Sequence, residues 1–250
     1  MSGAAMAELI RTLAGSDEAS LPAWWAARCA SVLGVDGLAV TLAPEGSASE
    51  LVLFSEPFTA RMEDLQYTLG EGPTREATRH SSPFLEPDLA VSEWQWPMFT
   101  PAAMDAGLRA VFAFPMRLGA IRVGAMTCYR RSIGPVGRQV FLDALALADA
   151  LTLFMVTVHL PSAPTVPASG PCGPVGQVGW VDLHRAQVHQ AAGMLAVDLR
   201  VSIVTALVRL RAVAYAQDRP ILEVAQDILE RRLRLSPDAA PCADKRPRRS

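Results

Sequence analysis

The sequence has few of the residues on which enzyme and metal sites depend. It contains four cysteines and four histidines in 250 residues, and no two cysteines form a CxxC pair. No HExxH, GxSxG, phosphate-loop or GxGxxG motif occurs. His184 and His189 are five positions apart, so on a helix they face different directions. We therefore expect no catalytic residue, no metal ion and no cofactor, and the scattered thiols are typical of a reducing cytoplasm.

The sequence also lacks a basic leader and a long hydrophobic run free of charge. The first residues include Glu8 and Arg11. The most apolar stretch, 140–158, contains Asp143 and Asp149, and charges inside a membrane span are costly. These features favour a buried helix over a membrane span, so we expect a cytoplasmic protein with no membrane partner.

Lysine is nearly missing, because Lys245 is the only one, and arginine supplies the other positive charges. The formal net charge of -2 hides a difference between the two halves of the chain. Residues 1–160 carry 11 basic and 17 acidic residues, a net charge of -6, whereas residues 181–250 carry 12 and 8, a net charge of +4. This difference favours contact between the C-terminal part and a polyanion.

A change of composition after position 160 predicts the domain organisation. Half of the chain is hydrophobic, which is enough for a full core and a second, smaller unit. Segment 161–180 is rich in proline and glycine and has no charge, as expected of a linker. We predict N-terminal helices (1–34), a sensory domain (35–160), this linker, a helical module (181–236) and a disordered basic tail (237–250).

Hydrophobic periodicity in the first part alternates between that of helices and that of strands. Strands are predicted at 38–42, 51–54, 111–118 and 121–129, and the last two flank a Gly119-Ala120 hairpin turn. A long helix, 136–159, follows. This order predicts an α+β domain on an antiparallel sheet with flanking helices.

The predicted helix 136–159 is apolar over an unusual width. One stripe has the spacing of a coiled-coil seam, and a second stripe runs beside it. The seam consists of Val140, Ala144, Leu147, Leu151, Phe154 and Val158, and the second stripe of Phe141, Leu145, Ala148 and Met155. The pattern favours packing on a partner helix in a homodimer, and the alternative is that the chain's own sheet covers both stripes.

Three amphipathic helices are predicted after the linker, which makes the C-terminal module all-α. On the second of them, Arg211 and Tyr215 lie four residues apart, and Arg219 follows at its end. A guanidinium beside an exposed phenol can stack on an unpaired base and contact its phosphate. The alternative is that Tyr215 packs against the third helix while Arg211 is merely solvated.

An aromatic cluster precedes a short predicted helix in the first domain. Trp94, Trp96 and Phe99 could line a small-molecule pocket, and the alternative is a hydrophobic plug over the sheet.

Residues 188–235 resemble the ANTAR domain of transcription antitermination regulators. The matching positions are Gln190, Ala191, Gly193, Met194 and Leu195, then Ser202, Ala206, Leu210, Arg211 and Ala214, and finally Arg219, Leu222, Val224 and Ala225. The resemblance implies a three-helix module that binds RNA hairpin loops in leader transcripts. It makes His189, Gln190, Arg211, Tyr215 and Arg219 the candidate RNA-binding residues. Ala192 stands where the family usually has lysine, so RNA binding is either weakened or, if that lysine serves packing, little changed.

Residues 30–158 resemble GAF domains that precede ANTAR modules. The matching stretches are LQYTLGEGP (65–73), Trp96-Pro97-x-Phe99, AVFAFPMRLGAIRVGAM (110–126) and LALADALTL (145–153), and Thr74 stands where cysteine is frequent. The resemblance implies a homodimer in which a ligand or signal at the GAF domain gates RNA binding and terminator read-through. Two other hypotheses stay open: a protein–protein signalling module that has lost RNA binding, and a small-molecule sensor that acts on a separate partner.

Overall fold

The computed structural model describes residues 2–14, 21–43, 49–159, 186–217 and 219–235. The chain divides into two compact units, Met1–His184 and Arg185–Ser250, and each is described by itself. The predicted linker (161–180) and basic tail (237–250) lie outside the described residues.

The first unit is organised around a five-stranded antiparallel sheet with the strand order β2-β1-β5-β4-β3. The strands are β1 (Gly37–Leu42), β2 (Glu50–Phe54), β3 (Phe84–Glu86), β4 (Ala110–Leu118) and β5 (Ile121–Arg130). The predicted hairpin is confirmed, with Gly119 at a φ of +60° in its turn. Gly124 is required where β1 and β5 pair, because a Cβ there would lie 2.0 Å from the Thr41 carbonyl oxygen. The prediction of an antiparallel sheet with flanking helices is therefore confirmed.

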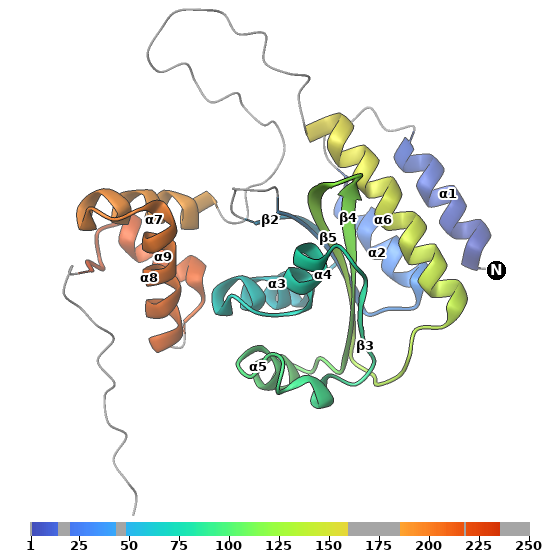
Figure 1. Cartoon of the computed structure of the whole chain (residues 1–250), viewed down its shortest axis with the longest axis horizontal. Coiled ribbons are helices and arrows are strands. Elements are labelled where there is room, and N and C mark those ends of the chain that lie inside the picture. Colours follow the sequence, from blue (N-terminus) through green and yellow to red (C-terminus); the bar gives the residue numbers. More distant parts are fainter. Residues whose placement is uncertain (1, 15–20, 44–48, 160–185, 218, 236–250) are drawn as a thin grey trace, which may run out of the picture. The chain divides into compact units, whose positions relative to one another are not determined.

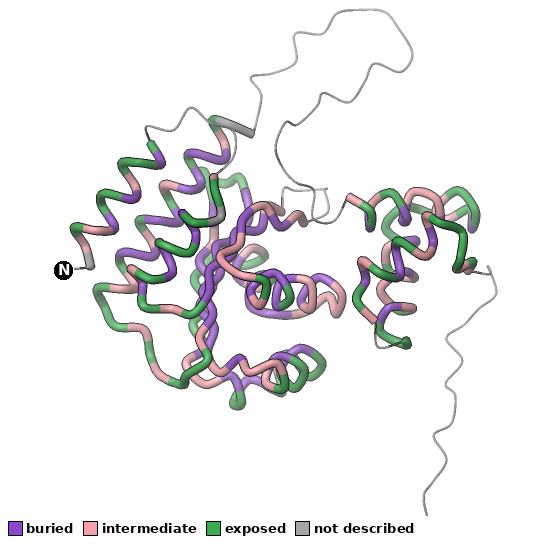
Figure 2. Tube along the Cα trace, turned by 180° about the vertical axis from the view of Figure 1, so that it is seen from behind, coloured by how far each residue is buried: buried purple, intermediate pink, exposed green. Residues whose placement is uncertain are grey.

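Helices cover both faces of this sheet (Figure 1). One face packs against α2 (Ala23–Leu33) and α6 (Arg138–His159), and α1 (Ser2–Ala14) packs on these two helices. The other face packs against α3 (Pro57–Leu69), α4 (Pro73–His80), α5 (Phe99–Asp105) and the 3-10 turn η1 (Leu89–Ser92). In the helices of the first unit, buried and exposed residues alternate along the chain, so that one side of each helix is turned inward (Figure 2).

Both apolar stripes of helix α6 contribute side chains to the core of the first unit. Ala144, Leu147 and Leu151 of the predicted seam and Ala148 and Met155 of the second stripe are all buried in one core. That core also contains residues of α1, α2 and the sheet. The named side chains are covered by their own unit, as in the alternative in which the chain itself covers the stripes, and Val140, Phe141 and Leu145 are partly buried.

Helix α6 is also the described helix that is long and apolar enough to cross a membrane, over Arg138–Thr157. Its burial in the core accounts for that composition, since the core helix of a domain and a membrane span have similar hydropathy. Asp143, within this window, is 7% exposed. The pair α7 and α8, bent by 109°, meets the same criterion only if it is counted as one span.

The second unit consists of three helices, α7 (Ala186–Leu199), α8 (Ile203–Ala216) and α9 (Ile221–Leu229). The predicted cap of α8 is confirmed, because Ser202 Oγ accepts a hydrogen bond from the Thr205 backbone N–H at 3.1 Å. The core is made mainly of small and aliphatic side chains: Val188, Ala191, Ala192, Leu195, Leu199, Ala206, Leu210, Ala214, Ile221, Val224, Ala225 and Ile228. This agrees with the expected all-α module.

Candidate functional site

A buried carboxylate lies between α3 and the sheet of the first unit. Glu63 of α3 is 2% exposed. Its Oε1 accepts hydrogen bonds from the hydroxyls of Tyr129 at 2.6 Å and Thr74 at 2.8 Å, and its Oε2 accepts one from Thr41 at 3.0 Å. Hydroxyl donors from three elements therefore replace the water that this carboxylate loses on burial.

Gln66, one turn after Glu63, completes this buried polar network. Its Nε2 donates to the hydroxyls of Thr74 at 2.9 Å and Tyr129 at 2.8 Å, and its Oε1 accepts from the Thr74 backbone N–H at 2.8 Å. Thr127 of β5 lies 2.8 Å from Thr74, hydroxyl to hydroxyl. The network (Thr41, Glu63, Gln66, Thr74, Thr127 and Tyr129) thus joins α3, the start of α4 and two strands.

The loop before α4 is shaped to admit the Gln66 side chain. Gly72 has a φ of +131°, and a Cβ there would lie 2.5 Å from Gln66 Oε1. The Gly70-Glu71-Gly72-Pro73 loop is therefore a turn that accommodates Gln66 and places Thr74 in the network. Sequence reasoning missed Glu63, Gln66, Thr41, Thr127 and Tyr129. The available signal was the pair of polar residues at i and i+3 on α3, and polar residues inside the apolar strand β5.

Burial also affects acid–base behaviour in this unit. Burial raises the pKa of Tyr129, and the nearby Glu63 carboxylate raises it further. The phenol therefore stays protonated and donates to Glu63. Burial likewise raises the pKa of the Cys29 and Cys128 thiols to about 12, so neither is an activated nucleophile. Among the described residues, no group of three potential ligands could hold a metal ion.

The predicted aromatic pocket residues separate in the structure. Trp96 and Phe99 are buried and pack edge to face, with ring centroids 6.1 Å apart. Trp94 is 82% exposed and lies outside that cluster. Trp96 Nε1 and the Thr100 hydroxyl, one helical turn apart, are buried without a hydrogen-bond partner. The structure thus brings together two of the three residues and adds two buried polar atoms beside them.

Glu71 connects the loop before α4 to α5. Its Oε1 accepts hydrogen bonds from the backbone N–H groups of Met98 at 2.7 Å and Phe99 at 2.8 Å. A carboxylate at this position satisfies backbone donors that the first turn of a helix leaves open.

Of the candidate RNA-binding residues, Arg211 and Tyr215 lie one turn apart on α8. Tyr215 is 57% exposed, so its phenol is open to solvent rather than packed under α9. Arg211 is half-buried. His189 and Gln190 lie on α7, where Gln190 is exposed and His189 is half-buried.

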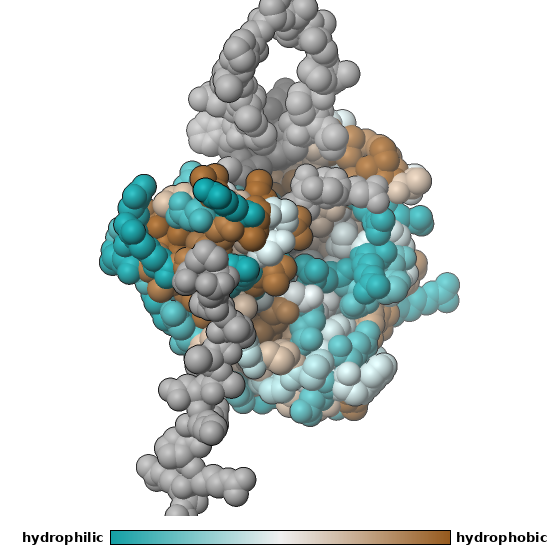
Figure 3. Space-filling view, turned by 60° about the vertical axis from the view of Figure 1, so that its left-hand side comes forward, coloured by the Kyte–Doolittle hydropathy of each residue, from teal (hydrophilic) through white to brown (hydrophobic). Residues whose placement is uncertain are grey.

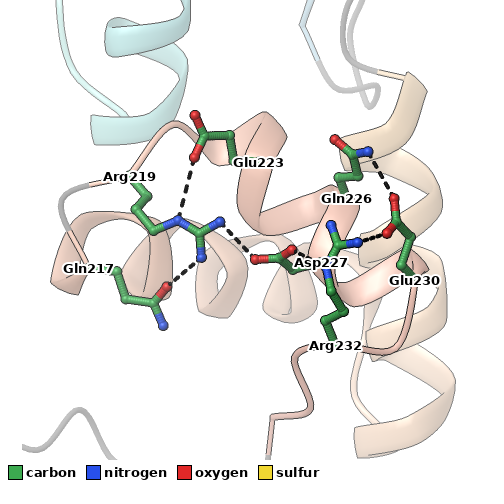
Figure 4. Close-up of polar contacts among 7 residues, drawn as sticks. All are labelled: Gln217, Arg219, Glu223, Gln226, Asp227, Glu230 and Arg232. Atoms are coloured by element: carbon green, nitrogen blue, oxygen red, sulfur yellow. Dashed lines mark hydrogen bonds and ion pairs between the residues drawn. The ribbon is translucent and has the colours of Figure 1, made fainter.

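Arg219 is held by acidic residues of its own module (Figure 4). Its guanidinium lies 2.7 Å from Asp227 and 3.5 Å from Glu223, and it donates to Gln217 at 3.3 Å. Arg232 binds Asp227 from the other side at 2.7 Å. The hydrogen bond from Arg219, followed by that from Arg232, lowers the pKa of Asp227. Arg219 therefore connects the end of α8 to α9. Its guanidinium is bound to these acidic residues and does not join Arg211 and Tyr215 in one site.

Two further features of the module concern which of its side chains are buried and which are exposed. Ala192 is 1% exposed, so the position where the ANTAR family usually has lysine belongs to the core here. Ile203, Val204 and Val208 of α8 are more than half exposed. Figure 3 shows apolar atoms at the surface of this module among hydrophilic ones.

Solved structures similar to this chain include several GAF domains. That of a phosphoenolpyruvate-protein phosphotransferase from Coxiella burnetii is 11% identical with a TM-score of 0.49, over 63% of this chain and 96% of that chain. The corresponding domain from Acinetobacter is 9% identical with a TM-score of 0.49, over 64% and 95%. Free methionine-R-sulfoxide reductase from Neisseria meningitidis is 16% identical with a TM-score of 0.46, over 64% and 90%. No protein-family model and no curated protein matches this chain.

Proposed function

We propose that this chain is a cytoplasmic, RNA-binding transcription antitermination regulator whose N-terminal unit is a GAF-type sensory domain. The observation that carries the proposal is the open Tyr215 phenol, 57% exposed, with Arg211 one turn before it on α8. These residues lie in the segment that resembles ANTAR domains. The layered antiparallel sheet of the first unit supports the GAF assignment.

The pair on α8 suits an unpaired base in a hairpin loop. A phenol that stacks on one base contributes ~1–3 kcal/mol, which is weak for a single module. A homodimer would present two such sites to one transcript, and the second contact would then be intramolecular. We therefore propose that the active form is a homodimer that engages two hairpin loops. His189 and Gln190 are further candidate contacts, whereas Arg219 serves the module's own structure.

Substitution of Tyr215 tests this proposal directly. Y215A in the full chain should weaken binding to a hairpin-loop RNA about 5- to 150-fold, the equivalent of the stacking contribution. Y215F keeps the ring and should bind nearly as well as the unsubstituted chain. V197A is the matched control, because Val197 is 77% exposed on α7 and outside the proposed contact. Equal affinity of Y215A and V197A, measured by electrophoretic shift or fluorescence anisotropy, would refute the site.

The salt dependence of binding provides an independent test. Binding through arginines to phosphates should weaken as salt concentration rises, because counterions released from the RNA drive part of the association. R211Q should reduce the slope of affinity against salt concentration as well as the affinity itself. A slope unchanged by R211Q would place the phosphate contacts elsewhere.

A protein–protein signalling module is the second candidate function. The exposed aliphatic side chains of Ile203, Val204 and Val208 on α8 favour it, because contiguous apolar surface often marks a protein contact. Recovery of no RNA after crosslinking in cells, together with an affinity for hairpin RNA that no variant changes, would favour this function over RNA binding.

A small-molecule ligand of the first unit is a further proposal. Trp96 Nε1 and the Thr100 hydroxyl favour it, because buried polar atoms without partners are rare. A ligand that accepts hydrogen bonds from both the indole N–H and the Thr100 hydroxyl would satisfy these two atoms. Native mass spectrometry of the purified chain tests for a retained ligand, and W96F should lower its occupancy.

A further inference from the structure

The turn that joins β4 to β5 has an unusual composition. Leu118, Gly119, Ala120 and Ile121 follow one another, all four are exposed, and none has a polar side chain. Leu118 is 46% and Ile121 63% exposed. Two-residue hairpin turns are usually rich in asparagine, aspartate and glycine. An exposed apolar run of this kind lowers solubility unless a partner covers it. We call residues 118–121 the hairpin tip.

Arginines flank the hairpin tip. Arg117 and Arg122 are direct partners in the β4–β5 ladder, where like charges repel. Arg122 Nη1 donates to the Arg79 carbonyl oxygen at 3.2 Å, so the last turn of α4 lies beside this pair. Arg79 and Arg117 are both exposed. Three arginines therefore gather where the sheet ends in an apolar turn.

Two carboxylates, those of Glu76 and Glu50, lie on elements that border this end of the sheet. Glu76 binds His80 Nε2 at 2.9 Å on the same helix as Arg79. Glu50 begins β2 and pairs with Leu42, which itself pairs with Gly124 of β5 near the tip. Residues 1–160 as a whole carry a net charge of -6. A basic and apolar end on an otherwise acidic unit indicates a partner that is both anionic and able to receive aliphatic side chains.

We propose that the hairpin tip docks reversibly on an anionic lipid bilayer. Leu118 and Ile121 enter the boundary between headgroups and acyl chains, while Arg79 and Arg117 lie at the level of the lipid phosphates. A protein partner fits less well, since two aliphatic side chains are far from the roughly 800 Å² that each side of a stable interface buries. RNA fits less well because the tip has no aromatic ring on which a base could stack. This proposal does not depend on RNA binding by α8.

Co-sedimentation of the full chain with vesicles tests the proposal. The chain should bind vesicles of equimolar phosphatidylglycerol and phosphatidylcholine, bind pure phosphatidylcholine much more weakly, and be released as salt concentration rises. The double variant R79Q/R117Q should lower the partition coefficient about 30-fold, at ~1 kcal/mol for each arginine near an anionic surface. L118S/I121S should also lose binding, through loss of the inserted side chains.

The matched control is R28Q/R61Q, which removes the same charge from two exposed arginines on α2 and α3. It should retain most of the vesicle binding. Tryptophan fluorescence and thermal unfolding establish that each variant folds, and an I121W variant should show a blue shift with the anionic vesicles. Equal partition of R79Q/R117Q and R28Q/R61Q, equal binding to both lipid compositions, or no binding to either would each overturn the proposal. Loss of RNA binding in Y215A with vesicle binding intact would leave it standing.

Discussion

At the scale of single residues, Thr74 has an unusual number of partners. Its backbone N–H donates to Gln66, and its hydroxyl donates to Glu63, accepts from Gln66 and contacts Thr127. A cysteine at this position would be a weak donor and a weak acceptor. The threonine hydroxyl therefore serves buried hydrogen bonding in this chain.

We predict that T74V destabilises the first unit by about 1–3 kcal/mol, because it leaves Glu63 and Gln66 with an unmade buried hydrogen bond. Urea unfolding monitored by tryptophan fluorescence measures this. The four tryptophans that the structure describes (24, 25, 94 and 96) all lie in the first unit, so their signal reports that unit.

T152V is the matched control for T74V. Thr152 is as deeply buried, but its hydroxyl donates only to the Ala148 carbonyl oxygen within α6, at 2.7 Å. That carbonyl already takes part in the helix, so loss of the hydroxyl should cost little. If both variants lost the same free energy of unfolding, the network would contribute nothing beyond an ordinary buried threonine.

At the scale of elements, the ion pairs between the end of α8 and α9 make the helical module sensitive to acid. Asp227 has a lowered pKa in the folded module because Arg219 and Arg232 stabilise its charged form. This contribution to stability is present above the ordinary pKa of an aspartate and is lost as pH falls through that range to the lowered value. The module should therefore lose helical circular dichroism in acid.

D227N should show what part of the acid transition belongs to this carboxylate. The variant should be less stable at neutral pH and should lose less of its remaining stability on acidification. D198N is the control, because Asp198 is exposed on α7, whereas Glu223 and Asp227 form the ion pairs with Arg219. An acid titration of D227N that matched that of the unsubstituted chain would contradict this account.

The sequence predicted helices and strands well where the hydrophobic residues of a segment follow either the helical or the strand spacing throughout. The β4–β5 hairpin, the Ser202 cap and the three helices of the module all follow from local signals. The partner of α6 did not follow, since a wide apolar face looks the same whether the chain's own sheet and α1 or a second copy covers it. The choice depends on contacts between residues far apart in the sequence.

The candidate sites were less predictable for the same reason. Glu63 and Gln66 have the composition of a solvated helix face, and only the position of Tyr129 and Thr127 opposite them makes them a buried network. Arg219 looked like a partner of Tyr215, but the fold places Asp227 beside it. Exposure of Tyr215 was predicted as one of two alternatives, and it is the one observed.

At the scale of the whole molecule, the two compact units should unfold separately. The helical module has a small core of mostly alanine and aliphatic side chains, and domains of this size are marginally stable. We expect thermal scans to show an early loss of helical circular dichroism with no change in tryptophan fluorescence, followed by a transition in both signals. A single transition in which the two signals coincide would mean that the units stabilise one another.

The Glu71 carboxylate connects the loop before α4 to the start of α5, which lies 27 residues further along the chain. The loop that contains Glu71 also positions Thr74 in the buried network. Glu71 Oε1 accepts a hydrogen bond from the first turn of α5. A shift of α3 or α4 that rearranges the network would therefore either move α5 as well or break the hydrogen bonds between Glu71 and the backbone of Met98 and Phe99. A rearrangement of the buried network would therefore change contacts near the molecular surface, where Trp94 is 82% exposed.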